Sequence, residues 1–189
     1  MYGKFGTATD IPQVGDYDGD GKADFVVYRP SEGNWYYMLS TGTTAVVHFG
    51  ISTDRPVAAD YDGDGKTDTA VYRAGTWYIL GTTSGFHGFQ WGISTDLPVV
   101  ADYDGDRKAD AAIYRNGDWY ILRSSDGGFS AFTFGTAGDI PVQADYDGDG
   151  KTDPSVYRPS TNMWFVNNAG GLSSGGFHFG SPGDLTVNY

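Results

Sequence analysis

The chain has 189 residues, enough for one domain with a real core, and its 24 acidic and 12 basic side chains give a net charge of −12. This acidity argues against a nucleic-acid partner, because phosphate binding needs a basic surface. The chain has no Cys that could form a disulfide, and no apolar run approaches the ~20 residues of a membrane helix, which argues against membrane insertion.

One stretch of the chain shows the order of elements that recurs throughout. Residues 56–59 are predicted as a short strand that leads into an acidic loop, and residues 69–73 as the strand that leaves it. A Gly turn precedes a third strand at 76–80, and a turn of Gly, Ser and Thr precedes a fourth that ends at Trp91. These runs are short, rich in β-branched and aromatic residues, and bounded by Gly or Asp, as strands are. No segment shows helical periodicity of useful length.

This unit occurs four times at a nearly constant spacing. The first acid of the acidic loop recurs after 44, 42 and 43 residues, together with Phe/Trp-Gly, Asp-x-Pro, Tyr-Arg and Trp-aromatic pairs. The repeats are placed at residues 7–50, 51–92, 93–135 and 136–180 of a single repeat domain, 1–189. Four antiparallel strands in about 43 residues are typical of a β-propeller blade. The predicted fold class is therefore all-β, a β-propeller built from four repeats.

The way in which the blades close into a ring is open at this stage, because four acidic loops stand beside five Phe/Trp-Gly markers. The terminal segments 1–6 and 181–189 are predicted to share a blade or to pair with a neighbouring chain. A single four-bladed ring is favoured. A larger ring from two chains and a strand-exchanged filament are the alternatives.

Each repeat carries a nonapeptide with acids at positions 1, 3, 5 and 9, as in DYDGDGKTD at residues 60–68. Carboxylates on alternate residues converge only if the chain curls, and Gly at position 6 permits the positive φ that a curl requires. Oxygen ligands without His or Cys suit a hard cation, and a flexible cage of this size suits Ca²⁺ better than Mg²⁺. The candidate ligands are Asp16, Asp18, Asp20, Asp24, Asp60, Asp62, Asp64, Asp68, Asp102, Asp104, Asp106, Asp110, Asp145, Asp147, Asp149 and Asp153.

The Phe-Gly pair, the Asp-x-Pro turn and the nonapeptide together resemble the FG-GAP and VCBS repeats of integrin α-subunit propellers and many secreted bacterial proteins. The resemblance covers essentially the whole chain. It implies Ca²⁺ ligation by the side chains at positions 1, 3, 5 and 9 and by a backbone carbonyl at position 7. The carbonyls would be those of Lys22, Lys66, Lys108 and Lys151.

The third acidic loop departs from this pattern, because Arg107 replaces the Gly at position 6. A side chain held at positive φ costs on the order of 1 kcal/mol, and the guanidinium brings a positive charge near the site. We expect up to four Ca²⁺ ions, with the third site weaker than the others.

Two other recurring pairs have both a structural and a binding interpretation. The Trp-aromatic pairs either fill the gaps between blades or form a sugar-stacking surface. The arginines of the Tyr-Arg pairs either recognise a carboxylate or sulfate, or pair with the acids of the Asp-x-Pro turns and hold the blades together. The structural interpretation is favoured for both. The expected ion pairs are Arg29–Asp10, Arg73–Asp54, Arg115–Asp96 and Arg158–Asp139.

No enzyme activity is predicted, because the three His do not recur with a nucleophile and no acid stands out as unmatched among the repeats. The predicted function is a non-catalytic, Ca²⁺-stabilised module with a structural, adhesive or assembly role. A carbohydrate-binding module and an accessory domain of a secreted enzyme are the alternatives. The expected partners are calcium and either the chain itself or a glycan. An extracellular or cell-surface location follows from the ~10⁻⁴ to 10⁻³ M affinity of extracellular calcium modules.

Overall fold

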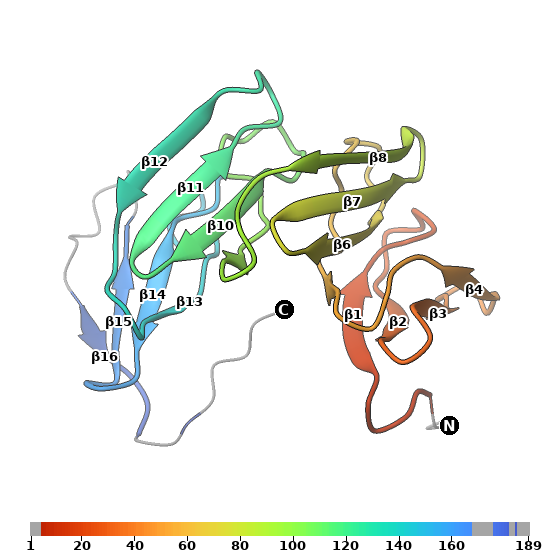
Figure 1. Cartoon of the computed structure of the whole chain (residues 1–189), viewed down its shortest axis with the longest axis horizontal. Helices are drawn as coiled ribbons and strands as arrows, with labels where there is room; N and C mark the ends of the chain where they lie inside the picture. Colours follow the sequence, from red (N-terminus) through yellow and green to blue (C-terminus); the bar gives the residue numbers. More distant parts are fainter. Residues whose placement is uncertain (1–4, 168–175, 182–183, 185–189) are drawn as a thin grey trace. The chain divides into compact units, whose positions relative to one another are not determined.

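The computed structural model describes residues 5–167, 176–181 and 184, and every regular element in these segments is a β-strand (Figure 1). The strands form four antiparallel sheets of four, and within each sheet they are neighbours in chain order. These sheets are propeller blades, so the predicted all-β, four-repeat propeller class is confirmed. No helix with the length and apolarity of a membrane span occurs among the described residues.

The chain divides into two compact units, each with two blades. In the first unit, blade 1 contains β1 (Ile11–Gly15), β2 (Asp24–Arg29), β3 (Asn34–Met38) and β4 (Thr44–His48). Blade 2 contains β5 (Arg55–Pro56), β6 (Thr69–Arg73), β7 (Thr76–Gly81) and β8 (Gly85–Gln90). In the second unit, blade 3 contains β9 (Leu97–Pro98), β10 (Ala111–Arg115), β11 (Asp118–Leu122) and β12 (Phe129–Thr133). Blade 4 contains β13 (Ile140–Pro141), β14 (Ser155–Arg158), β15 (Met163–Val166) and β16 (Phe177–His178).

The first strand of blade 2 is shorter than the predicted 56–59, because β5 ends at Pro56. Beyond β5, the two segments pair again at one isolated bridge between Ala59 and Asp68. In this bridge the Asp68 N–H donates to the Ala59 carbonyl at 2.8 Å. Blades 3 and 4 have the same bridge. The bridge joins the residue before the acidic loop to its last acid, so both ends of the loop are fixed.

The core of the first unit lies between blades 1 and 2. Side chains alternate along β3, and those of Trp35 and Tyr37 are buried. They pack with Tyr28 of β2 against Val71 of β6. One face of blade 1 thus buries its aromatic side chains against blade 2, as stacked repeats require.

The second unit repeats this arrangement, with a smaller side chain at one central position. Trp119 of β11 is fully buried and packs with Ile121, Val99 and Val156, and Phe134 and Phe165 cover the same cluster. Ile121 stands where the first unit has Tyr37, two residues after the buried Trp. The smaller side chain of Ile121 fills less of the space between the blades.

The expected arginine–aspartate pairs form, but each braces a single blade. Arg73 at the end of β6 donates from Nε to Oδ1 of Asp54 at 2.6 Å, and Asp54 lies just before β5 of the same blade. The Arg73 guanidinium also lies 4.6 Å from the centroid of the Tyr78 ring. These pairs therefore join two segments of one blade, and not neighbouring blades as predicted. The other pairs are Arg29–Asp10, Arg115–Asp96 and Arg158–Asp139.

The tyrosine of the Tyr-Arg pair links successive repeats in blades 1 and 3. The hydroxyl of Tyr28 donates to the Ile51 carbonyl at 2.6 Å, and that of Tyr114 donates to the Thr136 carbonyl at 3.1 Å. Burial raises the pKa of each of these tyrosines to about 12. The hydroxyls therefore remain protonated donors at neutral pH.

Candidate metal centres

Each acidic loop curls at position 6 as predicted. Gly21, Gly65 and Gly150 have φ angles of 82°, 84° and 86°. Arg107 takes the same left-handed conformation, with φ at 70°, which is strained for a residue with a side chain. The third loop thus keeps the shape of the others in spite of its different residue.

The first and last acids of each loop organise its backbone. In the second loop, the N–H of Gly63 donates to Asp60 Oδ1 at 2.6 Å, and the N–H of Gly65 donates to Oδ2 at 2.8 Å. The N–H of Tyr61 donates to Oδ2 of Asp68 at 2.9 Å. The other three loops make the same bonds. The nonapeptide therefore folds around its own carboxylates.

The acids at positions 1, 3 and 9 converge in every loop. Each acid offers one carboxylate oxygen, and the three oxygens lie within 4.8 Å of one another. Three anionic oxygens around one point fit a hard cation such as Ca²⁺, which takes oxygen ligands. The triads are Asp16–Asp18–Asp24, Asp60–Asp62–Asp68, Asp102–Asp104–Asp110 and Asp145–Asp147–Asp153.

The acids at position 5 stand outside these triads among the described residues. In the second loop, Asp64 Oδ1 accepts from the backbone N–H of Lys66 at 2.9 Å, and Oδ2 accepts from the Thr82 hydroxyl at 2.6 Å. Of the five predicted ligands of a loop, the acids at positions 1, 3 and 9 thus converge. The acid at position 5 is hydrogen-bonded to a neighbouring turn instead. The equivalent pairs at positions 5 and 7 are Asp20–Lys22, Asp106–Lys108 and Asp149–Lys151.

One buried carboxylate oxygen in the second loop supports cation binding directly. Asp62 Oδ1 has no hydrogen-bond partner among the described residues. Its other oxygen accepts from the N–H groups of Thr83 and Ser84, both at 2.9 Å. A buried charged oxygen without a partner is destabilising unless an ion or water satisfies it. The residues present therefore fit a bound cation.

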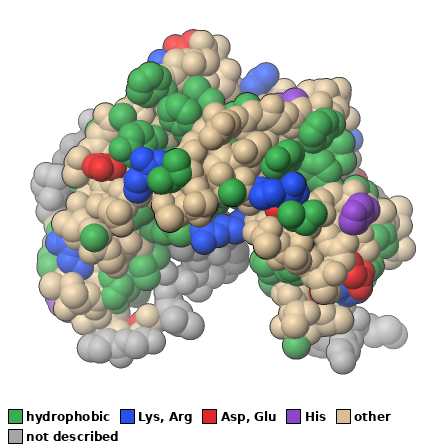
Figure 2. Space-filling model, in the orientation of Figure 1, with side chains coloured by type: hydrophobic (Ala, Val, Ile, Leu, Met, Phe, Trp, Pro, Cys, Tyr) green, Lys and Arg blue, Asp and Glu red, His purple; other side chains and the backbone are tan. Residues whose placement is uncertain are grey.

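In three of the triads, the pKa of the last acid indicates that its negative charge is unfavourable without a cation. Burial raises the pKa of Asp68 above its ordinary value, and the charge of Asp62 adds to this shift. Burial likewise raises the pKa of Asp110 and of Asp153, and neighbouring loop acids contribute. The nonapeptides hold sixteen of the chain's 24 acids, and few acidic side chains (red) are visible on the face in Figure 2. Negative charge is thus concentrated where a divalent cation would offset it.

A turn from the same blade covers each of the first three loops, and the sequence analysis missed it. The N–H of Ser40, Thr82 and Ser124 donates to the position-9 acid at 2.7, 2.7 and 2.8 Å, and the hydroxyl of each bonds to the position-5 acid. These residues follow the Trp of their repeat by five positions, a spacing that could have revealed them. The fourth repeat has Ala169 there, outside the described residues.

Neighbouring loops within each unit are joined by their backbones. The Asp16 carbonyl accepts from the N–H of Thr67 at 2.6 Å, and the Asp102 carbonyl accepts from that of Thr152 at 2.7 Å. Lys66 also lies close over the first loop, because a Cβ placed on Gly19 would come within 2.8 Å of its Cε. Order in one loop therefore supports order in the next.

The sugar-stacking interpretation of the Trp-aromatic pairs is not supported. Trp35, Trp77 and Trp119 are 0% exposed, so their rings cannot contact a glycan. The indole N–H of Trp35 donates to the Phe49 carbonyl, and that of Trp119 to the Phe134 carbonyl, both at 2.8 Å. Trp35 and Trp119 fill the space between the two blades of their units.

Comparison with protein families places part of this pattern in a known class. Residues 16–71, which include the first two acidic loops, match the model of an FG-GAP-like repeat. Together with the four blades, this match supports the FG-GAP propeller class. Comparison with curated proteins found no match.

Solved structures with a similar fold have diverse descriptions. One is an Agrocybe aegerita lectin described as recognising non-reducing terminal N-acetylglucosamine, with 19% identity, a TM-score of 0.61, and coverage of 83% of this chain and 48% of that chain. Another is BBS1N in complex with ARL6DN, with 15% identity, a TM-score of 0.59, and coverage of 90% and 54%. A third is a streptogramin B lyase, with 12% identity, a TM-score of 0.59, and coverage of 89% and 54%. The chain spans about half the length of these structures, and the likeness shows the fold alone.

Proposed function

We propose that this protein is a Ca²⁺-stabilised propeller module of the calcium-binding VCBS type, with a structural, adhesive or assembly role and no catalytic activity. The observation that carries the proposal is the convergence of three carboxylates in each of four loops, with a buried, unpartnered oxygen on Asp62. A fold compatible with a structural or binding module agrees with it.

The side chains of the triads would hold the ion, and the backbone bonds within each loop would orient them. Bound Ca²⁺ would supply the positive charge that the buried acids at position 9 and the buried oxygen of Asp62 lack. Because metal binds the folded loop and not the unfolded chain, binding would shift the folding equilibrium towards the native state. The module's rigidity would then depend on the calcium concentration around it.

We further propose an extracellular or cell-surface location. Calcium sites in extracellular modules have dissociation constants of ~10⁻⁴ to 10⁻³ M. Sites of this affinity are filled outside the cell and empty in the cytosol. An accessory role beside a secreted enzyme remains an alternative for the same module.

Thermal unfolding in 5 mM CaCl₂ and in EDTA tests the structural role of calcium. We expect chelation to lower Tm by about 5 °C or more, because four sites of this affinity each contribute a stabilising binding free energy. An unchanged Tm in EDTA would refute structural calcium.

A substitution of the last acid in the second loop provides the matched control. Asp68→Asn removes a buried charge and keeps an oxygen that can accept from Tyr61. We expect this variant to be less stable than wild type in calcium but no less stable in EDTA. A loss of stability of the same size in both buffers would contradict a metal-binding role for Asp68.

A further inference from the structure

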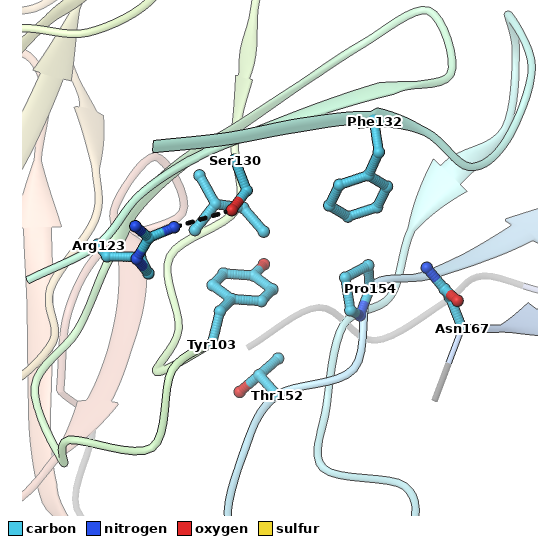
Figure 3. A pocket seen from close by; sticks show the side chains of 8 residues that line it. Tyr103, Arg123, Ser130, Phe132, Thr152, Pro154 and Asn167 are labelled. Carbon is cyan, nitrogen blue, oxygen red and sulfur yellow. Dashed lines mark hydrogen bonds between the residues drawn. The ribbon is translucent and has the colours of Figure 1, made fainter. Parts of the chain in front are cut away.

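A second candidate site lies within the second unit, in a pocket of about 310 Å³ between blades 3 and 4 (Figure 3). Tyr103, Ile121, Phe132 and Pro154 provide apolar walls. Figure 3 shows the Arg123 and Ser130 side chains on one side of this space and Asn167 on the opposite side. The volume is at the lower end of the ~300–1,000 Å³ found for ligand sites, so it suits a single small ring rather than an extended chain.

The pocket exists because the second unit departs from the first at two positions. In the first unit, Tyr37 packs edge-on against Tyr17 at 5.4 Å between ring centroids, and its hydroxyl is 2.6 Å from the hydroxyl of Thr69. Ile121 stands at the position of Tyr37, and Pro154 at the position of Thr69. The second unit has thus lost both a ring and a buried hydroxyl pair.

Arg123, a polar residue of the pocket, also departs from the repeat pattern. Arg123 replaces Leu39 and Gly81 of the earlier repeats. Its Nε and Nη2 donate to Asp126 at 3.1 Å each, and Nη1 donates to Ser130 Oγ at 3.0 Å. These contacts use three of the five guanidinium N–H groups, so two donors remain for a ligand.

The charge around the pocket favours an uncharged ligand. Asp126 Oδ2 lies 3.1 Å from Nη2 of Arg123 and offsets its charge. An anion would meet the Asp126 carboxylate, whereas a cation would meet the guanidinium. Thr152 and Asn167 add hydroxyl and amide groups that both donate and accept.

We propose that this pocket binds one uncharged sugar ring. Such a ring has an apolar C–H face, which matches the aromatic and Pro154 walls. Its hydroxyls match the donors and acceptors of Arg123, Ser130, Thr152 and Asn167. The site borders the third acidic loop through Tyr103 and the fourth through Thr152, and none of the buried tryptophans lines it.

Saturation-transfer NMR and calorimetry of the whole chain in 5 mM CaCl₂ test this proposal. The probes are methyl β-D-glucopyranoside, methyl β-D-galactopyranoside and N-acetylglucosamine. We expect at least one to bind with a dissociation constant on the order of 1 mM, because a ligand of this size makes few contacts. Failure of all three to bind would overturn the proposal.

The first unit supplies the design of the blocking variant. Ile121→Tyr restores the side chain that fills the corresponding space between blades 1 and 2, and we expect it to weaken binding at least tenfold. Arg123→Met, which keeps the apolar stem, should weaken binding without filling the pocket, and Arg55→Met, on the exposed edge of blade 2, is its control. Melting curves establish that each variant is folded. Binding that is unchanged in Arg123→Met, or in folded Ile121→Tyr, would overturn the proposal.

Discussion

Arg107 is the residue at which the four acidic loops differ most. It holds the conformation that Gly has in the other loops, and its N–H still donates to Asp102 Oδ2 at 2.7 Å. The third loop therefore has the same backbone conformation as the others, but it carries backbone strain and an added positive charge. Both effects would weaken a cation site without abolishing it.

Replacing Arg107 by Gly is expected to tighten calcium binding at the third candidate site about fivefold, because it removes about 1 kcal/mol of strain. Calcium titration by calorimetry would measure the change. Arg107→Asn separates the two causes, since Asn removes the charge but keeps a side chain that tolerates positive φ. Equal affinities for wild type and Arg107→Gly would contradict the expectation.

The ion pair of blade 1 predicts a specific pH dependence. Hydrogen bonds from Arg29 lower the pKa of Asp10 from 3.8 to about 2, against the opposing effect of burial. Because the folded pKa is below the unfolded one, the pair's contribution to stability is complete above pH 3.8 and disappears as the pH falls through about 2. NMR titration of the Asp10 carboxyl should give this low pKa, and Arg29→Met should raise it. A wild-type value near 3.8 would contradict the pairing.

At the scale of the single blade, the arginine–aspartate pair fastens the segment before the first strand to the end of the second. Arg73→Met keeps the apolar stem but leaves the Asp54 carboxylate, which is 0% exposed, without its counter-charge. We expect a loss of about 3 kcal/mol in the free energy of unfolding, as for other broken buried pairs. Urea denaturation would measure it. The control Arg55→Met should change stability by less than about 0.5 kcal/mol, and equal effects would contradict the bracing role.

Elements also cooperate around each of the first three candidate metal centres. The acidic loop supplies the triad, whereas the turn after the third strand supplies Ser40, Thr82 or Ser124 to the acids at positions 5 and 9. The acid at position 5 thus accepts a hydrogen bond from a hydroxyl 18 or 20 residues further along the chain. A metal centre of this kind is a property of the whole blade and not of the nonapeptide alone.

At the scale of the whole molecule, the favoured single ring predicts a monomer. Light scattering coupled to size exclusion should give about 20.3 kDa at all concentrations from micromolar to millimolar. A constant mass of twice this value would favour the larger ring from two chains. A mass that grows with concentration would favour the filament.

The sequence by itself determined the four repeats, the order of strands and the position of each acidic loop. These features depend on local pairing and on a period of about 43 residues, which is visible along the chain. The positive φ at Gly65 and at Arg107 was predicted for the same reason, since a curl of nine residues is a local property.

Only the tertiary structure decided how these local parts meet. It showed that three acids of each loop converge while Asp64 bonds to Thr82, and that Arg73 braces its own blade. It also showed that Ile121 and Pro154 open a pocket where Tyr37 and Thr69 close one. Each outcome depends on volumes and hydrogen bonds between segments far apart in the chain, and the repeat period carries no information about them.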